Sequence, residues 1–154
     1  MTYSVIIWKA VLWGLVILVI NMIIGNVLYM NPLTAKIFKS YEGNQTMKTV
    51  DDFGGTGKYV GLNMLSGTFI IIVYLVIFLT VYPILPGNWL IKGLIFGIAI
   101  VCVKAIPEAF NQYMLVRYPV KLIRVQLMNS IVSTLLFGIY TSLIYKLTHT
   151  IMMS

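Results

Sequence analysis

The hydrophobic positions of this 154-residue chain fall into long stretches that polar segments separate. A helix needs about 20 mostly apolar residues to cross a bilayer, and residues 11–30 form the first uncharged run of that length. A second uncharged run, residues 59–91, is divided at 83–88 by prolines, a glycine and an asparagine, which indicate a tight turn. The pattern predicts spanning helices over about residues 5–30, 62–82, 89–116 and 125–146, with a polar connection over 31–61.

The third stretch allows two interpretations. A helix from Lys92 to Arg117 would cover about 37 Å at the helical rise, which spans a bilayer and places Lys104 near mid-depth. Alternatively, the helix breaks at Pro107, because proline followed by glutamate is a favoured helix start. Residues 107–118 would then form a separate amphipathic segment on the membrane surface. We favour a continuous helix with a kink at Pro107, because residues 89–103 alone are short for a span.

The composition supports the lipid bilayer as the solvent of these stretches. Hydrophobic residues make up 60% of the chain and charged residues 10%, against about a half and a quarter in soluble domains. A soluble chain of this length could not bury so much apolar surface. We therefore predict an all-α fold, a single four-helix transmembrane bundle over residues 1–154.

The net charge of +7 comes from eleven Lys/Arg against four acidic residues. Because most basic residues flank apolar stretches, they indicate lipid headgroups as partners, with no nucleic acid. Lys9, Lys92 and Lys146 fall on one side of the predicted topology. Seven fall on the other, namely Lys36, Lys39, Lys48, Lys58, Arg117, Lys121 and Arg124. This asymmetry predicts that the first and third connections are cytoplasmic and that both termini lie outside.

The third helix carries the candidate polar site. Lys104, Glu108 and Asn111 are spaced by four and three residues, which places them on one helical face. Pro107 adds to the site, because it lacks a backbone donor and frees a carbonyl one turn earlier. Charged groups inside a bilayer are costly and normally face a bundle interior or a wet cavity. The site could therefore serve an ion, a proton or a ligand's headgroup. Alternatively, Lys104 and Glu108 form an internal pair that cancels its own charge.

Small and hydroxylated side chains predict how the helices pack. Gly93 and Gly97 make a GxxxG pair, and such residues let helices approach closely and hydrogen-bond. On the fourth helix the corresponding residues are Ser130, Ser133, Thr134 and Gly138. Asn129, on the same helix, is the best candidate to face Glu108 or Lys104.

Few residues could support catalysis or bind a metal. The chain has one cysteine and one histidine, too few for a nucleophilic triad or a histidine-based metal site. We predict no cofactor and no catalytic residues. Three hypotheses for function follow. The first is assembly as a homo-oligomer or as an accessory subunit of a membrane complex. The second is a channel or carrier that uses Lys104, Glu108 and Asn111. The third is a lipid-binding or lipid-modifying enzyme.

The stretch over residues 87–97, GNWLIKGLIFG, precedes Ile106–Pro107 and a hydroxyl-rich last helix. In these features the C-terminal half resembles a class of small bacterial inner-membrane proteins of about this length with four predicted spans. The resemblance implies a four-helix bundle in a bacterial cytoplasmic membrane. It implies no site residues.

Overall fold

The computed structural model describes residues 3–29, 31–41 and 51–153, with side chains over 13–29, 31–41 and 51–148. Within these ranges the chain is helical and forms no strand. The elements are α1 Tyr3–Tyr29, α2 Pro32–Lys39, η1 Asp51–Phe53, α3 Thr56–Val81, η2 Tyr82–Ile84, α4 Trp89–Ile100, η3 Val101–Ala105, α5 Ile106–Leu115 and α6 Val120–Met153. The turns η1 and η2 are 3-10 helices, and η3 is a π-helical turn.

Three helical stretches are long and apolar enough to cross a membrane: Thr56–Ile84, Trp89–Leu115 and Val120–Thr148. Their lengths of 29, 27 and 29 residues exceed the roughly 20 that a span requires. This indicates an integral membrane protein. The N-terminal part differs. Trp13–Tyr29 is long and apolar enough to cross a membrane only when it is taken together with Pro32–Lys39, and the two helices are bent by 68° relative to each other.

The second and fourth predicted helices begin earlier than the apolar pattern indicated. α3 starts at Thr56, directly after Gly55, whose φ of 102° suits a glycine. α6 starts at Val120, where the carbonyl of Pro119 accepts from the backbone N–H groups of Leu122 and Ile123. In both cases the first turn of the helix contains a lysine, Lys58 or Lys121, that precedes the long apolar run. A prediction from apolar runs alone therefore places these starts too late.

The predicted polar connection contains the short helix α2. Its N-cap is Asn31, whose side chain accepts from the backbone N–H of Thr34, and Pro32 occupies the first turn. An asparagine at the N-cap and a proline in the first turn both favour the start of a helix. Leu33 is 79% exposed, and Lys36 and Lys39 fall in the last turn. α2 is therefore an amphipathic helix of the kind that lies at a membrane surface.

The third predicted helix is continuous from Trp89 to Leu115. Its regular pattern is interrupted by η3, where the backbone N–H of Ile106 donates to the carbonyl of Val101, five residues earlier. Pro107 follows in α5, where its missing N–H leaves a carbonyl one turn earlier without a helical donor. The residues after Pro107 thus extend the same helix as far as Leu115.

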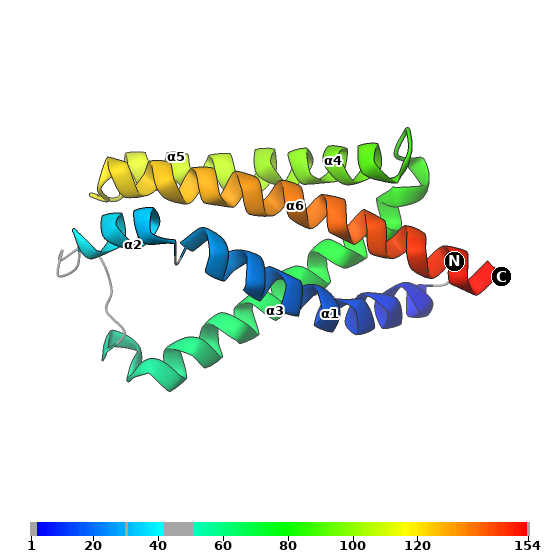
Figure 1. The fold of residues 1–154 in the computed structure, drawn as a ribbon, viewed down its shortest axis with the longest axis horizontal. Coiled ribbons are helices and arrows are strands. Elements are labelled where there is room, and N and C mark those ends of the chain that lie inside the picture. Colours follow the sequence, from blue (N-terminus) through cyan, green and yellow to red (C-terminus); the bar gives the residue numbers. More distant parts are fainter. Residues whose placement is uncertain (1–2, 30, 42–50, 154) are drawn as a thin grey trace.

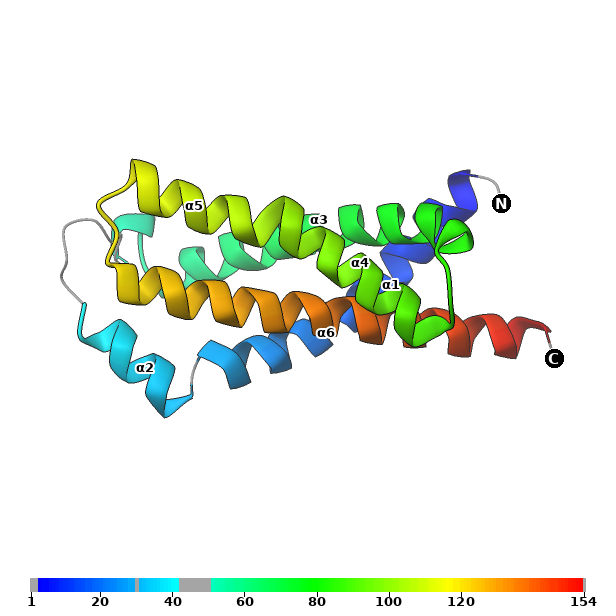
Figure 2. The ribbon, with the colours of Figure 1, turned by 90° about the horizontal axis from the view of Figure 1, so that it is seen from above.

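The α4–α5 stretch and α6 lie antiparallel along their length, while α1 and α3 cross beside them (Figures 1 and 2). The seam between α4 and α6 is built on Gly93, Gly97 and Gly138. Modelling a Cβ atom onto Gly93 would bring it 2.6 Å from the carbonyl oxygen of Gly138. Only glycine allows two backbones to approach this closely.

The hydrophobic core cluster extends from the middle of the helices, where Ile17 of α1 and Phe137 of α6 lie, to the C-terminal part of α3. Phe78 of α3 is fully buried there, with ring centroids 5.0 Å from Phe96 and 6.2 Å from Tyr145. At the opposite end the N-terminal half of α3 diverges from the other helices, and its residues 56–66 are all exposed. The C-terminal half of α3 is therefore packed against the other helices, and its N-terminal half leaves one side of the structure open.

Candidate functional site

The open half of the bundle contains three cavities, and one residue lines all of them. The described residues enclose volumes of about 460, 240 and 600 Å³, and Lys104 lies in the wall of each. No other described residue is shared by all three. Lys104 projects from the π-helical turn η3, a type of turn that is frequent at functional sites. Lys104 is therefore the described residue that the three cavities have in common.

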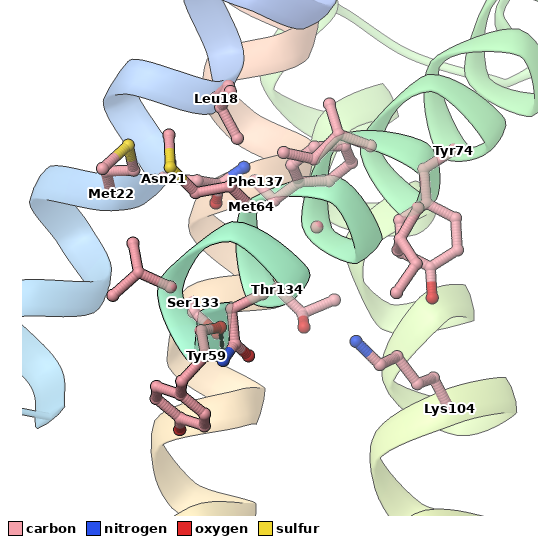
Figure 3. A pocket seen from close by; sticks show the side chains of 15 residues that line it. Leu18, Asn21, Met22, Tyr59, Met64, Tyr74, Lys104, Ser133, Thr134 and Phe137 are labelled. Atoms are coloured by element: carbon pink, nitrogen blue, oxygen red, sulfur yellow. Dashed lines mark hydrogen bonds between the residues drawn. The ribbon is translucent and has the colours of Figure 1, made fainter. Parts of the chain in front are cut away.

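We call the first cavity the α3 groove; its volume is about 460 Å³. It lies between α1, α3 and α6, and Figure 3 shows the Lys104 side chain extending into it toward Thr134 and Tyr74. The Lys104 Nζ atom lies 6.0 Å from the centroid of the Tyr74 ring, at the outer limit of a cation–π contact. The lining residues are Leu18, Asn21, Met22, Tyr59, Val60, Asn63, Met64, Gly67, Ile70, Ile71, Tyr74, Lys104, Ser133, Thr134 and Phe137.

The second cavity, which we call the polar cavity, lies between α1, α5 and α6. Its polar lining residues are Tyr29, Lys104, Glu108, Gln112, Gln126 and Ser130. Gln126 donates through Nε2 to the Tyr118 hydroxyl at 3.0 Å. The Oε1 atom of Gln126 is buried and has no hydrogen-bond partner among the described residues. The polar lining of this cavity suits water or a polar ligand.

The third cavity, the α5 cleft, contains the residues that the sequence singled out together. Lys104, Pro107, Glu108 and Asn111 all line it, next to Tyr74 of α3. In the described part of the chain, no ion pair within 4 Å joins Lys104 to Glu108, and the contact recorded for the amine is the Tyr74 ring. The internal pair considered from the sequence is therefore not formed in this structure. Both charges face cavities instead.

Asn129 has a different partner from the residues it was expected to face. Its Nδ2 atom donates to the carbonyl of Leu28 at 3.0 Å, and Nδ2 of Asn31 donates to the same carbonyl at 2.6 Å. In a continuous α-helix this carbonyl would accept from residue 32, but Pro32 has no N–H. Asn129 thus satisfies a carbonyl that the end of α1 leaves free, and it ties α6 to the bend before α2.

The remaining predicted residues divide between packing and the cavities. Gly138 meets the backbone of Gly93 and Gly97 in the seam. The Ser133 hydroxyl donates to the carbonyl of Ser130 at 3.1 Å, and Thr134 is 8% exposed in the wall of the α3 groove.

Sequence reasoning missed the contributions of Tyr29, Asn63 and Tyr74 to the cavity walls. Ser142, one of the hydroxylated residues of the last helix, is fully buried, and its hydroxyl donates to the carbonyl of Trp89 at 2.5 Å. A tyrosine or serine within an apolar run gives no signal of the helix face it occupies. Helix rotation, which the sequence does not specify, determines these positions.

The arrangement can provide a cation, a carboxylate and several hydroxyl and amide groups along the cavities. Among the described residues, no group of three or more His, Cys, Asp or Glu side chains is placed to hold a metal ion. Cys102 is a free, exposed cysteine. No family model matches the chain, and neither a curated protein nor a solved structure shows significant similarity to it. The cavities and their side chains are therefore what supports a functional proposal.

Proposed function

We propose that this chain is an integral membrane protein that binds a small solute at Lys104 and moves it through the open half of the bundle. The observation that carries the proposal is that Lys104 lines all three cavities. Glu108 and Asn111 serve as further polar groups along the α5 cleft. No catalytic role is assigned to any of them.

The cost of a charge in the membrane supports this function. Lys104 lies near the middle of Trp89–Leu115, and a lysine at the centre of a spanning helix costs about 2.5–3.5 kcal/mol in insertion measurements. An ion pair with Glu108 would lower this cost, but Lys104 points toward the α3 groove instead. A cation that is costly and directed into a cavity fits a role in recognising a solute.

The test is flux in proteoliposomes that contain the purified chain. Protons, potassium and chloride are supplied in turn, and release is followed with indicator dyes. We expect Glu108→Gln and Lys104→Gln to abolish the flux that the wild-type chain supports. Lys121→Gln is the matched control, because Lys121 is exposed at the start of α6 and lines none of the three cavities. Wild-type flux equal to that of empty liposomes would refute the proposal, as would full flux with Glu108→Gln.

A four-helix transmembrane bundle is the topology that we propose with this function. α1 would be the fourth span, ending at the 68° bend before α2, and Pro107 would kink the third. The start of α1 and the end of α6 lie at the same end of the molecule (Figure 1), as an even number of crossings requires. We propose that the end carrying α2 faces the cytoplasm, because its connections hold most of the basic residues. With the resemblance noted from the sequence, this gives a bacterial cytoplasmic membrane with both termini outside.

Assembly is a second candidate, and the diverging half of α3 favours it. Gly57 and Gly61 form a GxxxG pair on that half, and a Cβ added to either would meet nothing within 4 Å. Such a pair commonly mediates contact between membrane helices. The partner would be a second copy or another membrane subunit.

Native mass spectrometry in nanodiscs tests this candidate. We expect Gly61→Leu to convert an oligomer into a monomer. Gly25→Leu is the control, because the surroundings of Gly25 on α1 are equally empty. A wild-type chain that is monomeric in nanodiscs would exclude self-assembly.

A further inference from the structure

The α3 groove is apolar over most of its surface, unlike the polar cavity. Leu18 and Met22 of α1, Met64 and Ile71 of α3, and Phe137 of α6 contribute to this apolar wall. Its volume of about 460 Å³ falls in the range of roughly 300–1,000 Å³ that ligand sites occupy. The groove is therefore of a size and character to hold an apolar chain.

The polar groups of the groove come from four helical segments: Asn21 from α1, Asn63 from α3, Lys104 from η3, and Ser133 and Thr134 from α6. Lys104 extends toward Thr134, with Ser133 beside it on α6 (Figure 3). Among the described residues that line the groove there is no aspartate or glutamate. The positive charge of Lys104 thus has no acidic counterpart in this wall. In a low-dielectric setting such a charge attracts an anion strongly.

We infer that the α3 groove binds a single-chain amphiphile with an anionic head, such as a fatty acid, drawn from the surrounding lipid. The head lies at Lys104, with the Thr134 hydroxyl and the Asn63 amide as hydrogen-bond donors. The chain lies along the apolar wall between α1 and α3, where its burial is favourable. The volume lies in the lower half of the usual range for ligand sites, which suits one chain rather than two.

The groove is open toward lipid on the α3 side. Val60 and Met64 line it and are nevertheless 46% and 42% exposed, because the N-terminal half of α3 diverges from the bundle. An amphiphile can therefore enter sideways from the bilayer without crossing water. Methionine side chains are flexible and adapt to irregular ligands, and Met22 and Met64 both line the groove. The inference rests on the binding part of the proposed function, since it names the class of solute that binds at the same lysine.

The test measures ligand binding to the full chain in nanodiscs of phosphatidylcholine. A pyrene-labelled fatty acid is the reporter, and oleate, oleyl alcohol and dioleoyl phosphatidylglycerol are the competitors. We expect oleate to bind about tenfold or more tightly than oleyl alcohol, because a hydrogen bond to a charged partner contributes that much. Lys104→Met should remove the preference for oleate over the alcohol, and Lys104→Arg should retain it.

A matched pair of variants tests the position of the chain. Met64→Trp places bulk in the groove and should weaken oleate and oleyl alcohol alike. Leu65→Trp adds the same bulk to the neighbouring residue, which is 71% exposed and does not line the groove, and should leave both affinities unchanged. Circular dichroism and size-exclusion chromatography establish that each variant is folded. If Lys104→Met does not fold, the remaining variants still test the inference: Lys104→Arg should prefer oleate to oleyl alcohol, and Met64→Trp should bind oleate more weakly than Leu65→Trp does.

The inference would be overturned by equal affinity of the wild-type chain for oleate and oleyl alcohol. Undiminished oleate binding by Lys104→Met or by Met64→Trp would overturn it too. Displacement by phosphatidylglycerol as strong as that by oleate would exclude the single-chain ligand. The outcome is separable from that of the proposed function. Oleate binding without flux supports this inference and refutes solute movement, whereas flux without oleate binding refutes this inference alone.

Discussion

The glycine seam between α4 and α6 makes a sharp prediction about stability, and Gly138→Ala tests it. A Cβ added at Gly138 would overlap the carbonyl oxygen of Gly93 and would lie 2.9 Å from the backbone nitrogen of Gly97. Both neighbours are backbone atoms, so neither can rotate away. The two helices must separate to admit the methyl group. The surrounding contacts of the seam are then lost together.

Two opposing contributions set the change in the free energy of unfolding that Gly138→Ala causes. Overpacking of a well-packed contact costs about 1–3 kcal/mol and occasionally more. Replacing glycine by alanine in a helix returns at most about 1 kcal/mol. We therefore expect Gly138→Ala to lower the free energy of unfolding by about 1–2 kcal/mol. Gly97→Ala should cost less, because its Cβ would lie 3.0 Å from the nearest atom, the Cα of Leu135.

Gly61→Ala is the matched control, since a Cβ at this helical position would meet nothing within 4 Å. Here the helix-propensity term acts alone, and stability should stay unchanged or rise by up to about 1 kcal/mol. The assay is reversible unfolding in mixed detergent and dodecyl sulfate micelles, followed by circular dichroism. Equal midpoints for Gly138→Ala and Gly61→Ala would refute the close approach of the helices.

Two further variants are expected to change stability in the same unfolding assay. Asn129→Leu removes one of two donors to the Leu28 carbonyl. It should lower the free energy of unfolding by about 0.6–1.7 kcal/mol, as measured for hydrogen bonds between membrane helices. An unchanged stability would show that Asn31 alone satisfies this carbonyl. Asn88→Ala removes the N-cap of α4, whose side chain accepts from the backbone N–H of Ile91. This variant should lower the free energy of unfolding by about 1 kcal/mol, whereas Asn88→Ser should retain most of that stability. Equal midpoints for the alanine and serine variants would contradict the capping role.

The helical class and the long apolar stretches could be predicted from the sequence, because a bilayer requires runs of a fixed length. The helix ends could not. The first turns that follow Thr56 and Val120 contain Lys58 and Lys121, and a charged residue at this place interrupts the apolar signal from which the start was predicted. The partner of Asn129 was equally hidden. Pro32 reveals in the sequence that the Leu28 carbonyl lacks a donor, but it does not reveal which side chain provides one.

The candidate site was predicted as a set of residues but not as an arrangement. Spacing placed Lys104, Glu108 and Asn111 together, and the structure brings all three to the α5 cleft. The cavities also need Tyr29 of α1 and Tyr74 of α3. These positions depend on how α1 and α3 rotate about their axes. A helix that is apolar all round carries no pattern that fixes its rotation.

The π-helical turn explains how a glycine seam and a charged site share one helix. In a straight α-helix Lys104 would follow Gly97 by seven residues, or nearly two full turns, and would therefore face α6. The turn η3 acts as one additional residue, so positions after it rotate by about 100°. Ala105, 3% exposed, takes the place in the seam that the α-helical repeat would give to Lys104. Lys104 and Glu108 are exposed to the cavities instead. The irregular turn therefore moves both charges from the tightest contact of the bundle into its open half.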